Sequence, residues 1–429
     1  MPGTNVFSPR LSFAQSIPVE HWVTKQTVTA NRDLRENRPL WADTSRISVI
    51  TRQTPRERFY DVVIVGAGIS GALMANALAD GRRSILVVDR RGPVKGSSMA
   101  STAMIQHEID VPLFKLAQTI GGPRAARVWQ RSAQAVEGLK ALVQGLRIPC
   151  QFEARQTLYL AGEAYGARAL KEESKARAQA GLEARFLDAD ELEQQFGIDR
   201  PAAIVSKMSA SANPAQMTAG LLRDARRHGC EIVAGLEITD LHAGEPVVLA
   251  TSSGQLLLAS HVVFCTGYEF LKPLANRQHR IISTWAIASK PGLKLPPWLS
   301  EALVWEGADP YVYFRTTPDG RLIAGGEDED SSEAYLSEAK LKTKGRTIAE
   351  KVGDLLHCAI GSPDYVWSAG FGSTPTGLPM MGEVPGLKNV YAVMGYGGNG
   401  FTFSKIGAEI IAAMIGKKRD PDAELFSFR

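Results

Sequence analysis

Long apolar runs, paired cysteines and a strong charge of either sign are all missing from this sequence of 429 residues. No stretch approaches the ~20 consecutive apolar residues that a membrane-spanning helix needs. The 49 basic and 45 acidic residues leave a net charge of +4, which is too weak to indicate nucleic acid or a membrane surface as a partner. A chain of this length can form two or three domains with proper cores. Nothing in the sequence indicates an oligomeric state.

Cysteine is scarce and dispersed. Cys150, Cys230, Cys265 and Cys358 form no C-x-x-C pair and no metal-ligand spacing, so reduced, packed thiols are favoured over disulfides, and we expect no metal. The N-terminal segment lacks the apolar core of a secretory signal, so we expect a cytoplasmic protein. Its Arg and Ser with few acids leave an organelle transit peptide as an alternative.

The segment from Phe59 to Asp89 carries the strongest pattern. A β-branched run, "DVVIVGAG", precedes a helical stretch and a second apolar run, "SILVVD", which together predict a βαβ unit. Gly66, Gly68 and Gly71 spell GxGxxG at the first turn, and Asp89 ends the second strand about 20 residues on. Such a turn presents helix N–H groups to a pyrophosphate, and the carboxylate accepts the hydroxyls of an adenosine ribose. This segment therefore predicts a dinucleotide site.

A second GxGxxG, formed by Gly395, Gly397 and Gly400, lies near the C-terminus. It also follows a predicted strand and opens a predicted helix, but no second buried strand comes after that helix. It cannot complete a mononucleotide-binding half. The remaining use of such a helix start is to present N–H groups to a partial negative charge, such as the N1–C2=O locus of a reduced flavin. The two motifs together indicate FAD rather than NAD.

The order of predicted elements indicates an α/β fold. We expect an FAD-binding Rossmann-like domain of the glutathione-reductase type, interleaved with an antiparallel-sheet substrate domain. Pro318, Asp319 and Gly320 mark a hairpin within the antiparallel part. The predicted division is an N-terminal arm over 1–57, pinned in part by Trp41, an FAD-binding domain over 58–150, 205–280 and 358–429, and a substrate domain over 151–204 and 281–357.

Four blocks of the sequence resemble the D-amino-acid oxidase superfamily, which includes glycine, sarcosine and γ-glutamylputrescine oxidases. These blocks are "DVVIVGAGISG", "DRRGPVKGSSMASTAMIQHE", "HVVFCTGYE" and "GLPMMGEVPGLKNVYAVMGYGGNGFTFS". They are distributed over most of residues 59–416. The resemblance implies transfer of a hydride from a C–H next to nitrogen to flavin N5. The product is an imine that water hydrolyses, and dioxygen usually reoxidises the flavin with release of peroxide.

The resemblance also implies a cofactor site with FAD bound non-covalently, since none of the cysteines stands in a flavin-linking context. It assigns the pyrophosphate turn, the ribose, the adenosine and the two flavin edges to the following residues: Gly66, Gly68, Ile69, Ser70, Gly71, Asp89, Arg90, Arg91, Ser97, Ser98, Ser101, Thr102, Ile238, Thr266, Gly267, Gly398, Asn399, Gly400 and Phe401.

Two departures from the family concern the substrate and the acceptor. Gly372 and Ser373 stand where amino-acid oxidases carry an Arg that clamps the substrate carboxylate. Either the substrate has no carboxylate there or another cation serves. The candidate is Arg315, which shares a predicted strand face with Tyr311 and Tyr313, although a structural ion pair is an equal alternative. Ile323 stands roughly where sarcosine oxidases place a Lys that promotes oxygen reduction, which weakens the prediction of an oxidase.

The remaining catalytic candidate is His107, which follows "STAMIQ"; a histidine bonded within the structure is the favoured alternative. The aromatic residues Trp285, Trp305, Tyr311 and Tyr313 indicate a substrate cavity or a core. We expect an FAD-dependent oxidase of a small amine or amino acid. A dehydrogenase that passes electrons to a quinone or carrier protein, and a non-catalytic flavin-binding assembly protein, are the alternatives.

Overall fold

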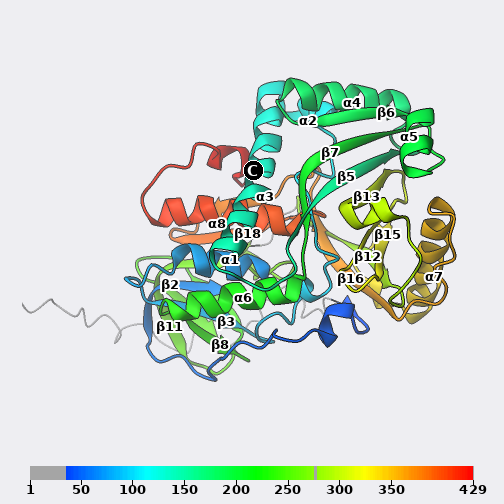
Figure 1. The fold of residues 1–429 in the computed structure, drawn as a ribbon. Coiled ribbons are helices and arrows are strands. Elements are labelled where there is room, and N and C mark those ends of the chain that lie inside the picture. Colours follow the sequence, from blue (N-terminus) through cyan, green and yellow to red (C-terminus); the bar gives the residue numbers. More distant parts are fainter. Residues whose placement is uncertain (1–34, 275–277, 429) are drawn as a thin grey trace, which may run out of the picture.

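The computed structural model describes residues 35–274 and 278–428 (Figure 1). The predicted arm over 1–57 is therefore described only from Arg35 onward, and its first 34 residues lie outside the described part. Strand β1 (Arg35–Glu36) pairs antiparallel with β16 (Tyr365–Ser373). Trp41 is buried, and its indole Nε1 donates to the Ser101 carbonyl at 2.7 Å. Trp41 thus pins the described part of the arm, as predicted.

The first sheet contains the predicted βαβ unit. Strand β2 lies between β3 and β11, parallel to both, and β8 and β18 continue the parallel pairing outward. The strand order is β17-β18-β11-β2-β3-β8, with β10 joining β11 to β9. The strands are β2 (Phe59–Val65), β3 (Ile85–Asp89), β8 (Glu231–Ala234), β9 (Ile238–His242), β10 (Val247–Thr251), β11 (Leu256–Phe264), β17 (Met380–Glu383) and β18 (Val390–Met394).

Both faces of the first sheet are covered, which is why its strands read as continuous apolar runs. Val62 and Ile64 face the core beneath helices α1 (Ile69–Leu78), α6 (Pro214–Arg227) and α8 (Gly400–Ile415). Val63 and Val65 face the opposite core, which the β9–β10 hairpin closes. Helix α1 packs between α6 and α8, so the helix starts after the two glycine-rich turns belong to neighbouring helices (Figure 1).

Residues 113–145 form two helices, α2 (Leu113–Ile120) and α3 (Gly122–Gly145). The chain breaks between them at Gly121, whose φ of 89° lies in the region that favours glycine. Trp129, Ala133, Val136 and Leu139 form a buried stripe along α3. Helix α3 packs against α8 and links the two parts of the molecule.

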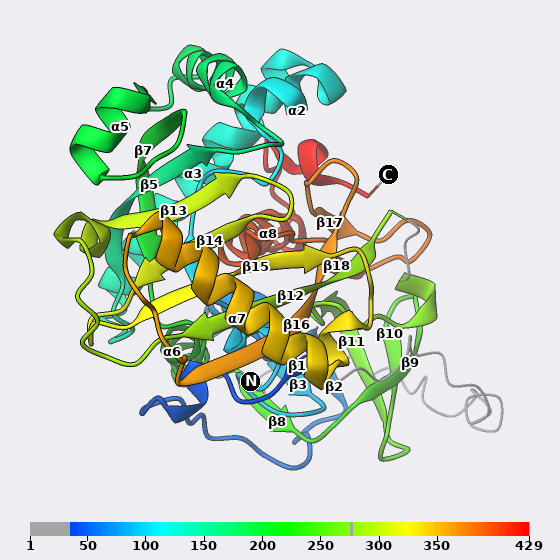
Figure 2. The ribbon, with the colours of Figure 1, turned by 90° about the vertical axis from the view of Figure 1, so that its right-hand side faces the viewer.

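The second sheet has the strand order β1-β16-β12-β15-β14-β13-β5-β7-β4, with β6 on β7. Helix α7 crosses its outer face (Figure 2), and α4 and α5 lie near β6 (Figure 1). The predicted Pro-Asp-Gly hairpin joins β14 to β15. The further elements are β4 (Met104–Ile105), β5 (Glu153–Ala161), β6 (Ala184–Asp188), β7 (Ala202–Ser211), β12 (Arg280–Ala288), β13 (Ala302–Gly307), β14 (Val312–Thr316), β15 (Leu322–Glu329), α4 (Ala167–Gln179), α5 (Ala189–Phe196) and α7 (Glu338–Leu355).

Three strands differ from the predicted division. β4, β7 and β16 pair within the second sheet, whereas 104–105, 205–211 and 365–373 were predicted in the FAD-binding part. The chain passes from the second sheet to the first after Ser211 and after Ser373, rather than at the predicted boundaries of 205 and 358. A buried strand has the same apolar pattern in either sheet, so the sequence did not distinguish the partner.

Candidate functional site

A cavity of about 490 Å³ lies between the two sheets and reaches both glycine-rich turns. All of the predicted cofactor residues line it except Gly71. Tyr311 and Tyr313 also line it, while Arg315 and His107 do not. The predicted residues therefore come together around one cavity from segments that are far apart in the sequence.

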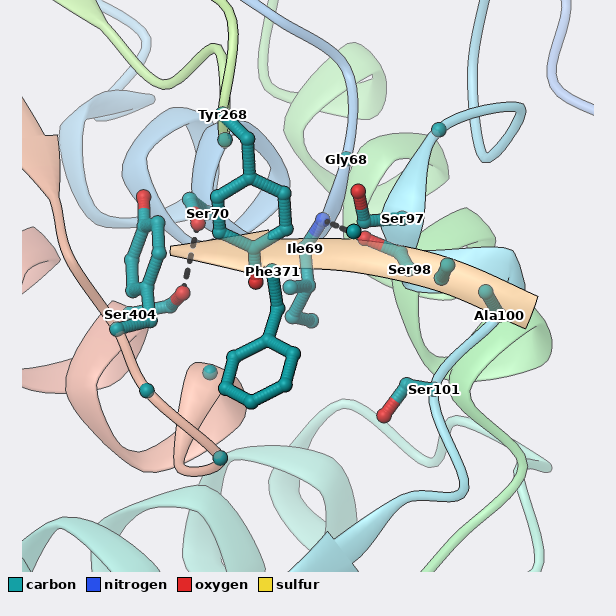
Figure 3. A pocket seen from close by; sticks show the side chains of 18 of the residues that line it. Gly68, Ile69, Ser70, Ser97, Ser98, Ala100, Ser101, Tyr268, Phe371 and Ser404 are labelled. Atoms are coloured by element: carbon teal, nitrogen blue, oxygen red, sulfur yellow. Dashed lines mark hydrogen bonds between the residues drawn. The ribbon is translucent and has the colours of Figure 1, made fainter. Parts of the chain in front are cut away.

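The first turn is shaped by glycines that leave no room for a side chain. Gly66 has a φ of 110°, and a Cβ there would overlap the Cys265 carbonyl. A Cβ at Gly71 would overlap the Gly66 carbonyl, so Gly71 sets the close approach of α1 to β2 rather than lining the cavity. Helix α1 begins at Ile69 and provides no helical acceptor for the first N–H groups. The Ile69 N–H donates to Ser98 Oγ at 2.8 Å (Figure 3).

Asp89 holds the turn together from the end of β3. Its Oδ2 accepts the Ala67 N–H at 2.8 Å, and its Oδ1 accepts the N–H groups of Arg91 and Gly92 at 2.8 and 2.7 Å. A carboxylate has about four acceptor positions, so one remains for a ribose hydroxyl. Beside it, Arg90 and Arg91 form ion pairs with Glu269, which also lines the cavity.

Polar atoms without partners indicate what this end of the cavity takes. The hydroxyls of Ser97 and Thr266 are buried, line the cavity and make no hydrogen bond within the described residues. Ser70 and Ser404, which also line the cavity, are hydrogen bonded to each other at 2.7 Å (Figure 3). Free hydroxyl donors, a helix N-terminus and the spare acceptor of Asp89 fit the diphosphate and ribose of FAD.

The second turn is organised differently from the prediction. The Gly398 N–H donates to Asp110 Oδ2 at 2.9 Å, and the Asn399 N–H donates to the Tyr396 carbonyl at 3.2 Å. These two groups are therefore already engaged. Helix α8 begins at Gly400, so the N–H groups of Gly400 and Phe401 have no helical acceptor, and both residues line the cavity. Of the N–H groups at the second turn, only those of Gly400 and Phe401 fit the predicted role of donating to the N1–C2=O locus of a flavin.

Aromatic and acidic side chains line the part of the cavity next to the second sheet. Trp305 stacks on Tyr159 with ring centroids 3.8 Å apart, and Tyr311 lies 6.0 Å from Tyr313. The Tyr311 hydroxyl donates to Asp328 Oδ2 at 2.8 Å. The other lining residues of these kinds are Asp110, Tyr165, Tyr268, Glu306, Phe371 and Tyr396. Trp305, Tyr311 and Tyr313 were predicted here, whereas Trp285 is fully buried in the core.

Burial changes the acid strength of these carboxyl groups. It raises the pKa of Asp328 to about 6, and Asp110 contributes to that rise. Burial also raises the pKa of Asp110, although the N–H of Gly398 opposes the change. Glu306 is already engaged, since it accepts from Arg200 Nη2 at 3.0 Å and from the Val312 N–H at 3.2 Å.

Arg315 is not at the cavity, which corrects its predicted role. Its Nε donates to the Thr102 carbonyl at 2.7 Å, its Nη1 to the Thr316 carbonyl at 3.0 Å and its Nη2 to the Ala212 carbonyl at 3.1 Å. The side chain is buried, with its guanidinium over the Trp41 ring. Strand alternation predicted its face correctly, but the cavity ends before this residue along β14.

His107 and Ile323 are also parts of the interior. His107 is buried with its Nδ1 3.5 Å from Ser209 Oγ and its ring edge-on to Trp129. Burial lowers the pKa of His107 to about 4. This is the bonded histidine that was the favoured alternative. Ile323 is fully buried in the cluster around Trp41 and does not line the cavity.

The position of the absent carboxylate clamp cannot hold a long side chain. A Cβ at Gly372 would overlap His279 Nε2 and approach Tyr268 Cδ1 to 2.9 Å. Ser373 lines the cavity but carries no charge. Among the described lining residues, the cations are Arg90 and Arg91, both at the end where Asp89 lies. No group of His, Cys, Asp and Glu in the described part could hold a metal ion.

Comparison with known proteins identifies the family. The DAO family, described as FAD dependent oxidoreductase, matches residues 61–414. The chain belongs to this family. It is therefore an FAD-dependent oxidoreductase, and the cofactor of the cavity is FAD. No helix in residues 35–274 and 278–428 is long and apolar enough to cross a membrane.

The proteins that this chain resembles have names that describe different reactions. The chain is 21% identical to the gamma-glutamylputrescine oxidoreductase of Escherichia coli over 370 residues, and the alignment covers 83% of each protein. The glycine oxidase of Geobacillus kaustophilus superposes with a TM-score of 0.73 at 19% identity, over 87% of this chain and 99% of that one. The L-proline dehydrogenase of P. horikoshii gives 0.69 at 16% identity, over 88% and 97%. Likeness at these identities establishes the fold.

The sequence did not predict Asp110, Asp328 or Tyr268. Each is a common residue type outside a recognised motif, and 45 acidic residues offer no way to choose two. The two aspartates are recognised only in the folded structure, where Asp328 of β15 and Asp110 of the segment before α2 both line the cavity near the second turn.

Proposed function

We propose that this protein oxidises a C–N bond in a small amine or amino acid. When bound, FAD would supply a two-electron acceptor. The substrate carbon would lose a hydride to flavin N5 and the amine nitrogen would lose a proton, leaving an imine that water hydrolyses. The observation that carries this proposal is the continuity of one cavity from the turn before α1 to the aromatic part. A small molecule in that part would lie against the cofactor.

The proposed FAD contacts follow the geometry of the two turns. Asp89 would accept the ribose hydroxyls, the start of α1 with Ser97 and Thr266 would bind the diphosphate, and Ile238 would offer its backbone to adenine. Gly400 and Phe401 would donate to the pyrimidine edge of the flavin. FAD would be held without a covalent bond: Cys265, the cysteine among the described lining residues, has a thiol whose pKa burial raises to about 12, so its thiolate is unavailable.

The chain itself would mainly position the substrate and exclude water. Hydride transfer from a neutral amine needs little acid–base assistance, so orientation and cofactor tuning carry the rate. The stacked Trp305–Tyr159 pair and the Tyr311–Tyr313 pair supply rigid walls for that purpose. Dioxygen is the proposed acceptor, with hydrogen peroxide as product. A quinone or carrier protein is the alternative acceptor.

Anaerobic reduction of the bound flavin by a panel of amines and amino acids tests the proposal. We expect at least one compound to bleach the flavin, and admission of air to restore its colour with one peroxide per substrate consumed. Bleaching without rapid reoxidation by air would replace dioxygen by the alternative acceptor. A flavin that dithionite reduces, but that no amine or amino acid reduces, would contradict the proposed function.

A further inference from the structure

The charges that line the cavity are separated between its two ends. Arg90 and Arg91 lie at the adenosine end and are paired with Glu269. The aromatic end carries Asp110 and Asp328, and no Lys or Arg among the described residues lines it. Glu306 also lines this end but is paired with Arg200. A bound substrate there therefore meets two carboxyl groups, Asp110 and Asp328, that form no ion pair with another described residue.

Asp328 has an acceptor atom that the protein leaves open. Its Oδ2 is bonded to the Tyr311 hydroxyl, while its Oδ1 is buried and completes no hydrogen bond. Thr284 lies close enough to lower the pKa of the group, and it also lines the cavity. A buried acceptor without a partner costs free energy unless a ligand or water donates to it. Asp328 is therefore placed to accept from a substrate.

Asp110 reaches the cavity because the second turn lacks side chains. A Cβ at Gly397 would overlap Asp110 Oδ2, and a Cβ at Gly398 would lie 3.0 Å from its Oδ1. The Gly398 N–H fixes the carboxyl group at 2.9 Å. Gly397 and Gly398 thus make room for a carboxyl group at the edge of the cavity.

Among residues 35–274 and 278–428, no Lys or Arg lines this end to neutralise an anion. His279 fills the space beside Gly372, and Arg315 donates to three backbone carbonyls. A substrate carboxylate would meet carboxyl groups of like charge, which is unfavourable. A cation would meet two carboxyl groups and the faces of tyrosine and tryptophan rings, which attract ammonium groups.

We propose that the substrate is a cationic amine without a carboxylate on the carbon that is oxidised, held through its charge by Asp110, Asp328 and the surrounding aromatic rings. The bound ammonium group would pass one proton to one of the two carboxylates before its carbon loses the hydride, so that the reacting amine is neutral. This rests on the proposed function and names its substrate class. An amino acid would be excluded by charge, although its carbon chain would fit as well as that of the amine.

Pairs of compounds that differ only in that carboxylate test the inference. Butylamine is norvaline without its carboxylate, and 1,4-diaminobutane is ornithine without its carboxylate. These two pairs, and the best substrate of the panel with its own carboxylated or decarboxylated partner, are titrated anaerobically against the oxidised holoenzyme. We expect the amine of each reactive pair to exceed its partner at least tenfold in reduction rate divided by Kd. Equal or better reduction by the carboxylated partner overturns the inference and leaves the proposed function standing.

Variants then assign the effect to the two carboxyl groups. Asp328→Asn and Asp110→Asn keep an acceptor for the Tyr311 hydroxyl and the Gly398 N–H. Asp330→Asn is the matched control, since Asp330 lies two residues along the chain from Asp328, is exposed and pairs with Arg280 outside the cavity. We expect each cavity variant to raise the amine Kd about tenfold or more with FAD content unchanged, and the control to leave it unchanged.

Amine affinity that is unaltered in both cavity variants, with FAD retained, would overturn the assignment. If one of the two cavity variants loses FAD, the amine Kd of the other cavity variant is used to test the assignment. The paired compounds on the unmodified protein decide the substrate class in either case. Failure of every amine and amino acid to reduce the flavin would instead contradict the proposed function.

Discussion

At the first glycine-rich turn a side chain on Gly71 would overlap the Gly66 carbonyl, whereas a Cβ on Gly400 in the equivalent place of the second turn would meet nothing within 4 Å. Helix α1 leads into β3, whose Asp89 reaches back to the Ala67 N–H. Helix α8 is followed by a short 3-10 helix, Ala423–Phe426, and by no strand in the described part. The first GxGxxG turn thus belongs to a βαβ unit, whereas the second GxGxxG turn makes room for the Asp110 side chain. The difference lies in what surrounds the glycines rather than in the glycines themselves.

The largest expected effect comes from adding one methyl group to a glycine of each turn and comparing the two variants. Gly71→Ala forces α1 away from β2, an overpacking that costs about 1–3 kcal/mol or more, and we expect little FAD to be retained. A methyl group at Gly400 meets no described protein atom within 4 Å, so Gly400→Ala should leave thermal stability unchanged and retain more FAD than Gly71→Ala. Flavin absorbance per protein and thermal unfolding measure both. Equal losses in the two variants would contradict the comparison.

Asp89 provides the next test, because the second turn has no counterpart to it. Asp89→Ala removes the proposed ribose acceptor together with the acceptor of three backbone N–H groups. We expect FAD binding to lose roughly 1.5–3 kcal/mol, which is about 10- to 150-fold in Kd. Titration of the apoprotein with FAD measures it. An unchanged Kd would show that the site assignment is wrong.

The fold and the cofactor end could be predicted because their signals are local. The turn at Gly66 and the second strand ending at Asp89 are each encoded within a few neighbouring residues. The aromatic end could not be predicted in the same way. Arg315 shares a strand face with Tyr313, yet sequence periodicity gives the face and not the extent of the cavity.

Acid should weaken substrate binding near the second turn and leave FAD at the first turn unaffected. The raised pKa of Asp328, about 6, reflects burial, to which Asp110 adds, while the nearby Thr284 side chain, the hydrogen bond from Tyr311 and the charge of Lys344 oppose it. An ammonium group binds the ionised carboxylate, so the amine Kd should rise by up to about tenfold per pH unit as pH falls below 6. Titrations between pH 5 and pH 8 measure this. Asp328→Asn should flatten the profile, and a profile unaltered by that change would exclude Asp328 as its source.

The smallest expected effect concerns the N–H of Gly400. Because Gly400 is the first residue of α8, proline has a suitable φ there but removes the donor. Losing one helix-terminus donor should destabilise the reduced, anionic flavin by about 0.3–2 kcal/mol, so the midpoint potential should fall and reduction should slow. Gly400→Ala keeps the N–H and is the control. A Gly400→Pro protein with its flavin, potential and reduction rate unchanged would limit this glycine to a role in the fold.

The central claim is that one turn binds a dinucleotide and the other lies beside an amine, and a single anaerobic experiment tests it most directly. The FAD-loaded protein is mixed separately with NADH, NADPH and the amine panel, and flavin absorbance is followed. The account predicts bleaching by an amine and no useful rate with either nicotinamide nucleotide. Rapid bleaching by NADH or NADPH, with none by any amine, would make the second turn a dinucleotide site and contradict the account.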